Sequence, residues 1–257
     1  MTQARTLSKI DLARAMDREE LVVVYQPQMT ADGLSMASVE ALVRWNHPQY
    51  GRIGPDDFIP VAERAGLIDL LGLYVLERAC RDAQAWPVIP VAVNISPTHF
   101  AKPGFVDDVA AVLATTWFPA ARLEIEIVES AAFGDPEGAK NQINRLHALG
   151  AHVSMDDFGT GYSSLSLLQR LPFDKVKIDK SFVDGIPASR SVAILHAIIA
   201  LVRALGMKVT AEGVETVEQQ RFLKAAGCHY LQGYLYARPL SADAIPEFLA
   251  RYRPAPR

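Results

Sequence analysis

The segment from Met155 to Ser164, with sequence MDDFGTGYSS, places two adjacent carboxylates directly after a short apolar stretch. The apolar residues predict a strand that ends at Asp156 and Asp157, and Gly159 and Gly161 let the backbone bend closely around a ligand. Neighbouring strand residues point to opposite faces, so the pair can supply a bridging ligand and a second ligand to two metal ions. The pattern is equally typical of a turn or a helix N-cap, so both interpretations stay open on this segment alone.

Strand and helix patterns alternate around this segment. The predicted strands lie at residues 21–25, 35–42, 91–95, 123–127, 151–155, 175–178, 208–211 and 230–232. The predicted helices lie at about residues 1–20, 56–65, 68–85, 105–116, 136–149, 165–170, 190–205, 216–226 and 242–251.

The order of these elements predicts an α/β fold. The turn at residues 31–33 is too short for a crossover helix, so the first two strands are expected to be antiparallel. The alternation that follows is typical of a (β/α)8 TIM-like barrel, here with an antiparallel first strand. The alternative is an open doubly wound sheet, but no Gly-x-Gly-x-x-Gly follows any strand. We expect one domain over residues 1–257, with a helix at about 1–20 and the barrel at about 21–251.

Polar side chains recur where the predicted strands end, which is where catalytic groups lie in such barrels. These strand ends carry Glu40, Asn94, Glu126 with Glu129, Asp156 with Asp157, Lys177 with Asp179, Glu212 with Glu215, and Gln232. A single polar strand end is as well explained by a structural hydrogen bond, but the whole ring indicates a site. So many carboxylates repel one another without cations, and hard oxygen ligands favour Mg²⁺ or Mn²⁺ over Zn²⁺. The six histidines lack metal-ligand spacing, which argues against zinc.

The composition is that of a globular protein, with 50% hydrophobic and 21% charged residues. The net charge of −3 argues against a protein that coats a nucleic-acid polymer. The N-terminus lacks the apolar core of a signal peptide, and the longest apolar run, residues 192–202, is too short to span a bilayer. Cys80 and Cys228 have no CxxC partner. We therefore expect a cytoplasmic protein without membrane or nucleic-acid-polymer partners.

Several short segments together resemble the EAL-domain cyclic di-GMP phosphodiesterase family. They are YQP at 25–27, EALVRW at 40–45, NIS at 94–96, EIVE at 126–129, DDFGTGYSS at 156–164, KID at 177–179, EGVE at 212–215 and QGYL at 232–235. Glu-Ala-Leu alone is a weak signal, but these segments follow the family's order from about residue 12 to 250. The family's fold is a barrel with an antiparallel first strand, in agreement with the turn at residues 31–33.

The resemblance implies a phosphodiesterase that hydrolyses cyclic di-GMP to linear pGpG with two divalent cations, Mg²⁺ or Mn²⁺. The first metal would be held by Glu40, Asn94, Glu126 and Asp156, and the second by Asp156, Asp157 and Glu212. The two ions would clamp the attacking and leaving oxygens of an in-line displacement and supply a metal-bound hydroxide near neutral pH. Lys177 would orient or deprotonate this water, or would only balance charge among the carboxylates.

The resemblance also assigns roles outside the metal ligands. Glu129 would position the loop after Asp157, and Gln26 and Arg44 would contact the substrate, Arg44 through a phosphate oxygen. Gln232 would orient water or Lys177. Asp179 has two open interpretations, a guanine contact or support of a loop.

Three aromatic residues, Trp45, Phe182 and Tyr234, are candidates for stacking on a base. We favour packing in the core or at the rim of the site for each of them. Val128 departs from the family's pattern, which has threonine there, so a hydrogen bond to the loop at residues 158–164 would be lost. The expected cost is about 1 kcal/mol, which predicts reduced loop order rather than an inactive enzyme.

Two other functions compete with the enzyme. A catalytically weak or inactive EAL domain would act as a cyclic di-GMP sensor, but here every ligand position and Lys177 carry competent residues. A barrel lyase or aldolase would need a Schiff-base lysine in an apolar setting, whereas Lys177 is expected among carboxylates.

Regulation and oligomeric state are only partly indicated by the sequence. Residues 190–202 are apolar almost all round, which fits a homodimer or burial in the barrel shell equally well. Because no sensory segment is recognisable, we expect regulation by a partner, by oligomerisation or by a sensory domain of a longer parent chain.

Overall fold

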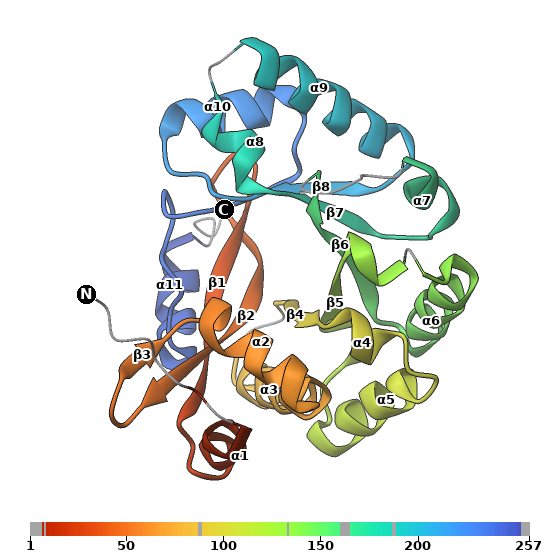
Figure 1. Ribbon diagram of the computed structural model, residues 1–257. Helices are drawn as coiled ribbons and strands as arrows, with labels where there is room; N and C mark the ends of the chain where they lie inside the picture. The colour runs from red at the N-terminus through yellow and green to blue at the C-terminus, as the bar shows by residue number, and fades with distance from the viewer. Residues whose placement is uncertain are drawn as a thin grey trace.

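The computed structural model describes residue 7 and residues 9–86, 89–132, 134–159, 165–186 and 189–252. Within this part of the chain, nine strands form one sheet, in the spatial order β1-β9-β8-β7-β6-β5-β4-β2-β3. A further pairing between β1 and β2 closes eight of these strands into a barrel, which the helices surround (Figure 1). The strands are β1 (Leu21–Thr30), β2 (Met36–His47), β3 (Gly51–Ile53), β4 (Val91–Ile95), β5 (Leu123–Val128), β6 (His152–Phe158), β7 (Lys175–Ile178), β8 (Lys208–Ala211) and β9 (Tyr230–Gln232).

Strand β1 runs against both of its barrel neighbours. It pairs antiparallel with β2 and with β9, whereas the pairs from β2–β4 through β8–β9 are parallel. The hairpin turn after β1 explains this reversal, since Gly33 adopts a left-handed φ of 73° and Leu34 donates its N–H to the Asp32 side chain. The predicted (β/α)8 barrel with an antiparallel first strand is therefore confirmed.

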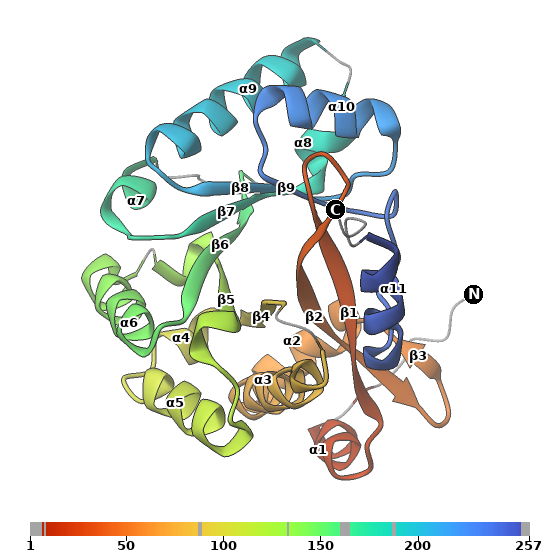
Figure 2. The same ribbon diagram turned by 180° about the vertical axis from the view of Figure 1, so that it is seen from behind.

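The helices form a layer outside the barrel, and α11 lies beside β1 in both views (Figures 1 and 2). They are α1 (Lys9–Asp17), α2 (Pro55–Ala65), α3 (Ile68–Gln84), α4 (Pro97–Phe100), α5 (Phe105–Thr116), α6 (Pro136–Leu149), α7 (Leu165–Arg170), α8 (Lys180–Asp184), α9 (Ser189–Ala204), α10 (Val217–Ala226) and α11 (Ile245–Tyr252), with the short 3-10 helices η1 (Ala120–Arg122), η2 (Glu129–Ala132) and η3 (Ala242–Ala244). No helix in the described ranges combines the length and the apolar character needed to cross a bilayer.

Local chemistry explains several helix boundaries. The N-cap of α10 is Thr216, whose side chain accepts from the Gln219 N–H while the Gln219 side chain accepts in return, forming a capping box. Asp135 caps α6 by accepting a hydrogen bond from the Gly138 N–H, and Pro136 occupies the first helical position.

The structure differs from the sequence-based expectation at several element boundaries. The helix predicted at about residues 1–20 is Lys9–Asp17, and it is wrong at its end, where Glu19 adopts a left-handed φ of 55°. Residues 1–6 and 8 lie outside the described residues. Strand β2 continues to His47 and pairs with β3, because the chain forms a hairpin at residues 48–50 that extends past the barrel. Helices α4 and α8 were not predicted, since four or five residues carry no periodic signal.

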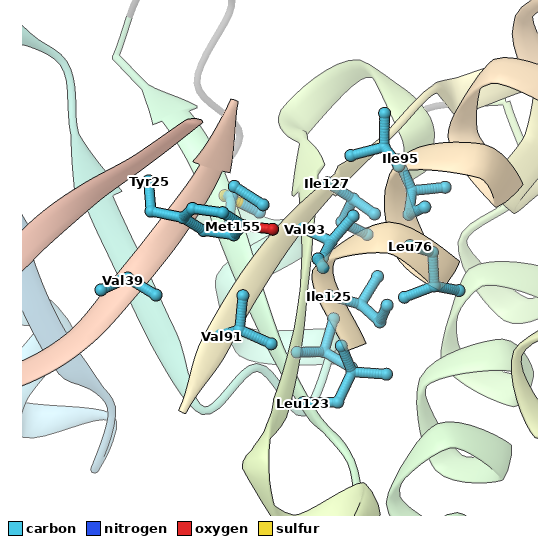
Figure 3. Packing of buried hydrophobic residues seen from close by; sticks show 14 of the residues in the cluster. Tyr25, Val39, Leu76, Val91, Val93, Ile95, Leu123, Ile125, Ile127 and Met155 are labelled. Atoms are coloured by element: carbon cyan, nitrogen blue, oxygen red, sulfur yellow. The ribbon is translucent and has the colours of Figure 1, made fainter. Parts of the chain in front are cut away.

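Side chains alternate between the two faces of the parallel strands. Val91, Val93 and Ile95 of β4 lie with Leu123, Ile125 and Ile127 of β5 on the side of Leu76 from α3 (Figure 3). The intervening residues of these strands, which include Asn94, Glu124 and Glu126, therefore face the barrel interior. The apolar core thus lies between sheet and helices, and the interior of the barrel is polar.

Candidate active site

The polar residues predicted at the strand ends converge at the C-terminal edge of the barrel. A cleft of about 340 Å³ lies at this edge, and its lining includes Gln26, Glu40, Asp156, Asp157, Lys177, Asp179, Glu212 and Gln232. A second cleft of about 630 Å³ adjoins it and is lined in part by Arg44, Asn94 and Val128. Leu42 and Asp157 line both clefts, so the two clefts are neighbours.

Lys177 is the centre of the first cleft. Its Nζ lies 2.7 Å from Glu212 Oε1, 2.9 Å from Glu126 Oε2, 3.1 Å from Asp156 Oδ1 and 3.5 Å from Glu40 Oε2. The side chain is 1% exposed. Burial alone would lower the pKa of Lys177, but the four carboxylates raise it well above its usual value. The ammonium group therefore stays charged.

The carboxylates form two groups that share one member. Glu40, Glu126 and Asp156 each offer an oxygen within 4.8 Å of the others, and so do Asp156, Asp157 and Glu212. These are the carboxylates expected in the two metal sites, with Asp156 in the shared position. Among the described residues no other group of histidine, cysteine and carboxylate side chains has this geometry.

The arrangement fits two divalent cations. Five carboxylates form the two groups around Lys177, and Glu126 Oε1 is buried without a hydrogen-bond donor among the described residues. Oxygen donors of this kind suit Mg²⁺ or Mn²⁺.

The carboxylate pKa values reflect this excess of negative charge. Burial raises the pKa of Glu126 well above its usual value against the effect of Lys177, and the neighbouring carboxylates add to the rise. Burial also raises the pKa of Glu212 to about 8, with Lys177 again opposing and Asp156 adding to it. Glu40 behaves differently, because Lys177 and the donors Gln232 and Asn94 outweigh burial and lower its pKa. Divalent cations bind deprotonated carboxylates, so they would displace the protons that this set retains.

Asp156 and Asp157 face the same cleft although they are adjacent on β6. The pairing of β6 with β7 is irregular between Met155 and Phe158, and Asp157 adopts a left-handed φ of 55°. The Asp157 N–H donates to Asp156 Oδ1 at 2.9 Å. In a regular strand the two side chains would lie on opposite faces, as expected from the sequence. This expectation is wrong, because the irregularity brings both side chains to the same cleft.

Amide side chains hold Glu40 from both sides. Asn94 Nδ2 donates to Glu40 Oε1, and Gln232 Nε2 donates to Glu40 Oε2, each at 2.6 Å. Gln232 also donates to Gln26 Oε1 at 3.2 Å, and Gln26 donates to the carbonyl oxygen of Ala237. Gln232 thus donates to Glu40 and Gln26, and its expected role in orienting water or Lys177 stays a prediction.

The other two predicted substrate contacts lie at the edges of the site. Arg44 is on the same face of β2 as Glu40 but about 13 Å farther along the strand, and it lines the second cleft. Asp179 is the N-cap of α8, where its Oδ1 accepts from the Ser181 N–H at 3.0 Å, and it also lines the first cleft. The structure therefore accommodates both interpretations of Asp179.

The three aromatic candidates have different environments. Trp45 is fully buried and donates from Nε1 to Glu20, so core packing is confirmed for it. Phe182 is partly buried against the core, and a Cβ at Gly159 would lie 2.4 Å from its ring. Tyr234 is 52% exposed at the rim of the first cleft, with the Arg238 guanidinium 4.5 Å from its ring centre.

Two residues that line the first cleft, Lys180 and Glu215, have no role predicted from the sequence. Lys180 follows Asp179, and Glu215 closes the segment EGVE after β8. The position of Glu215 at a strand end was a signal, whereas nothing marked Lys180 because α8 itself was not expected.

The family model described as EAL domain matches residues 10–239. The chain belongs to the EAL domain family. The resemblance stated from the sequence segments is therefore confirmed.

Several relatives of this EAL domain are longer signalling proteins. An uncharacterized signaling protein from Caulobacter vibrioides is 50% identical over 245 residues, which are 95% of this chain and 30% of that protein. From Pseudomonas aeruginosa, the bifunctional diguanylate cyclase/cyclic di-GMP phosphodiesterase MucR is 44% identical over 241 residues, or 91% and 35% of the two chains. The cyclic di-GMP phosphodiesterase NbdA from the same organism is 44% identical over 250 residues, or 95% and 32%. The EAL domain thus spans about a third of these relatives.

Solved structures show the same fold. The structure named PaMucR phosphodiesterase, c-di-GMP complex, matches with a TM-score of 0.88 and 43% identity, covering 92% of this chain and 98% of that one. An EAL domain protein from Listeria monocytogenes EGD-e matches with a TM-score of 0.85 and 30% identity, covering 96% and 99%.

Two positions of this EAL domain concern the loop after Asp157. Glu129 is the first residue of η2 and is 6% exposed, and Val128 pairs with Asp156 in the register of β5 and β6. Residues 160–164 of the loop lie outside the described residues. The support of this loop by Glu129, and its weakening by Val128, therefore stay predictions.

Proposed function

We propose that this EAL domain hydrolyses cyclic di-GMP to linear pGpG in a reaction that depends on two divalent cations. The observation that carries the proposal is the pair of carboxylate groups that share Asp156, with the charged Lys177 at their centre. The named activity of the relatives MucR and NbdA, and the c-di-GMP complex of MucR, support the same substrate.

The metal ligands follow from the two carboxylate groups. Glu40, Glu126 and Asp156 would hold one cation with Asn94, and Asp157 and Glu212 would hold the other with Asp156. When bound, Mg²⁺ or Mn²⁺ supplies positive charge that acidifies water and stabilises the attacking and leaving oxygens. Asn94 and Gln232 hold Glu40 in place through the two hydrogen bonds of 2.6 Å. Such contacts to a ligand fix its orientation before the substrate arrives.

Lys177 acts on the water molecule and on the phosphate. Formation of pGpG requires that the water oxygen bonds to phosphorus and that the P–O3′ bond breaks, which leaves a 5′-phosphate and a 3′-hydroxyl that takes up one proton of the water. The Lys177 Nζ lies within 3.5 Å of Glu40, Glu126, Asp156 and Glu212, so it can donate hydrogen bonds to a water or a phosphate held among these carboxylates. We therefore assign Lys177 to orienting the water and stabilising the negative charge that develops on the phosphate.

The two neighbouring clefts suit a substrate with two nucleotide halves. Gln26 and Asp179 line the first cleft, and Arg44 lines the second. We assign one half of cyclic di-GMP to each cleft, with Arg44 donating to a phosphate oxygen. Gln26 is oriented for such a contact by its bonds to Gln232 and Ala237. Glu129 would order the loop that follows Asp157.

The setting of the domain is proposed on separate observations. Cys80 and Cys228 are buried and unbridged, which supports a cytoplasmic location. Because the relatives extend well beyond this domain, we propose that a sensory domain or a partner regulates it.

Helix α9 buries Leu195, Ile199 and Val202 but leaves Ile194 44% exposed, and we propose this exposed face as a homodimer contact. A constant monomer mass across micromolar protein concentrations would contradict the homodimer.

Product analysis tests the function. The protein is incubated with cyclic di-GMP and Mg²⁺, Mn²⁺ or EDTA, and the products are separated by chromatography. We expect pGpG with either metal and intact cyclic di-GMP with EDTA. A sensor without catalytic activity would bind cyclic di-GMP and return it intact under every condition.

A further inference from the structure

A second buried ion pair lies one layer below Lys177 inside the barrel. Lys175 Nζ is 2.6 Å from Glu124 Oε2, and the two side chains are 7% and 9% exposed. Lys175 precedes Lys177 by two residues on β7, and Glu124 precedes Glu126 by two residues on β5. By strand alternation the two pairs face the same interior, about 6.6 Å apart along the strands.

Hydrogen bonds extend this ion pair to the first two strands. Lys175 Nζ donates to Gln28 Oε1 at 3.3 Å, and the same oxygen accepts from Ser38 Oγ at 2.7 Å. The Lys175 ammonium also lies 5.1 Å from the ring centre of Tyr230 on β9. We call Gln28, Ser38, Glu124 and Lys175 the lower polar layer.

Each member of the lower polar layer is two residues from a residue of the site on the same strand. Ser38, Glu124 and Lys175 precede Glu40, Glu126 and Lys177, and Gln28 follows Gln26 because β1 runs in the opposite direction. Each member is therefore joined to a site residue through a single intervening residue of its strand. The layer thus lies directly beneath the site on four strands.

Stability does not explain why this layer is polar. Barrel interiors are commonly filled by branched apolar side chains, and replacing a buried ion pair with apolar residues is often neutral or stabilising. Within the described residues, Gln28 Nε2 and Glu124 Oε1 have no hydrogen-bond partner, nor have Ser154 Oγ and Thr210 Oγ1. Buried polar groups without a hydrogen-bond partner lower the stability of the folded protein.

We propose that the Lys175–Glu124 ion pair is a positioning device for the reaction, which fixes the geometry and the charge balance of the carboxylates and Lys177 above it. Glu124 compensates a second buried ammonium that would otherwise lie beneath a site built to bind cations. Lys175, held by Glu124 and Gln28, ties β7 to β5 and β1 below the point where Lys177 and Glu126 meet. The proposal rests on the proposed function.

The test uses charge removal at one partner and at both. Glu124→Gln keeps the shape of the side chain but leaves the Lys175 charge uncompensated, and the double variant with Lys175→Met removes both charges. Lys208→Met is the matched control, since Lys208 pairs with Lys175 in the register of β7 and β8 but is exposed. Mn²⁺ affinity is measured without substrate, by electron paramagnetic resonance of free Mn²⁺, and kcat and KM are measured with cyclic di-GMP.

We expect Glu124→Gln to weaken Mn²⁺ binding and to lower kcat by roughly tenfold each, with KM within about twofold of wild type. The double variant should recover Mn²⁺ affinity to within about threefold of wild type, and Lys208→Met should match wild type. A merely structural pair would lower the thermal midpoint without changing Mn²⁺ affinity. A Glu124→Gln protein that binds Mn²⁺ like wild type, or a double variant weaker than the single one, overturns the proposal.

A fallback variant covers a folding failure of Glu124→Gln, and wild-type Mn²⁺ binding separates failure of this proposal from failure of the proposed function. If circular dichroism shows that Glu124→Gln does not fold, Ser38→Ala tests the same layer by removing one hydrogen bond and no charge. It should lower kcat about fivefold, and an unchanged kcat contradicts the proposal. A wild-type protein that binds Mn²⁺ without hydrolysing cyclic di-GMP refutes the proposed function alone, since the order of Mn²⁺ affinities still decides this inference. A wild-type protein that does not bind Mn²⁺ overturns both.

Discussion

Asp157 donates its backbone N–H to the side chain of Asp156, and its left-handed backbone turns both carboxylates toward one cleft. A non-glycine residue with positive φ carries a conformational cost, which aspartate and asparagine tolerate better than other residues. This strained conformation places the second carboxylate in the site, because a regular strand would direct only one of the two carboxylates there. This local distortion is what lets Asp156 belong to both carboxylate groups.

Asp157→Asn separates the backbone role of Asp157 from its charge. Asparagine keeps the tolerance for positive φ, so the free energy of unfolding should stay within about 0.5 kcal/mol of wild type. Loss of the carboxylate should reduce bound Mn²⁺ from two ions to one per chain, as measured by calorimetric titration. Asp243→Asn, at an exposed position on η3, should leave the stoichiometry at two. Two tightly bound Mn²⁺ ions in Asp157→Asn would show that Asp157 is not a ligand.

The raised pKa of Glu212 predicts a pH dependence of stability in the metal-free protein. The pKa of about 8 in the folded protein exceeds the ordinary value of 4.5, so the folded chain keeps a proton that the unfolded chain releases. This contribution to stability is fully present below about pH 4.5 and is lost as the pH rises through 8.

Denaturant unfolding in EDTA at pH 5, 6.5 and 8 can measure this effect. The free energy of unfolding of wild type should fall with pH relative to Glu212→Gln, which cannot titrate at this position. A difference between the two proteins that does not change with pH, or that changes in the opposite direction, would mean that Glu212 is already ionised at neutral pH.

Asp179→Asn distinguishes a guanine contact from a structural cap. Asparagine is as good an N-cap as aspartate, so α8 and the thermal midpoint should be preserved. Loss of a charged acceptor for the substrate should raise KM for cyclic di-GMP by about tenfold. Asp179→Ala should raise KM similarly and also cost about 1 kcal/mol of stability through the lost cap. If KM stays at the wild-type value in Asp179→Asn, Asp179 is a cap only.

Val128→Thr restores the hydroxyl that the family pattern has at this position. Activity on cyclic di-GMP should stay unchanged or rise by at most about fivefold, the worth of one hydrogen bond. Val217→Thr makes the same exchange at an exposed position of α10 and should have no effect. A large loss of activity in Val128→Thr would mean that the loop after Asp157 is arranged differently from the family.

Much of the site was predictable because parallel strands bring their C-terminal ends together. Glu126 and Glu212 are far apart in the sequence, and their strand-end positions place them around Lys177. Glu40 also reaches Lys177, but it lies within β2, which continues past it to His47. The reversal of β1 was predictable from the short turn that contains Gly33.

Other features depend on contacts that no local pattern reveals. The pattern around Asp157 indicates a regular strand, and its left-handed backbone appears only where β6 meets β7. In the sequence, Lys175 is simply the first residue of a predicted strand. Only the closed barrel brings it to Glu124, 51 residues earlier in the chain. Arg44 is a site residue by motif, but the length of β2 places it in the second cleft.

The most direct test of the account is the turnover of cyclic di-GMP by Asp156→Asn at saturating Mn²⁺, compared with wild type by chromatography. Asp156 is the member shared by both carboxylate groups and lies 3.1 Å from Lys177. A folded Asp156→Asn protein should yield no measurable pGpG while wild type converts its substrate. Near-normal production of pGpG by Asp156→Asn would contradict it.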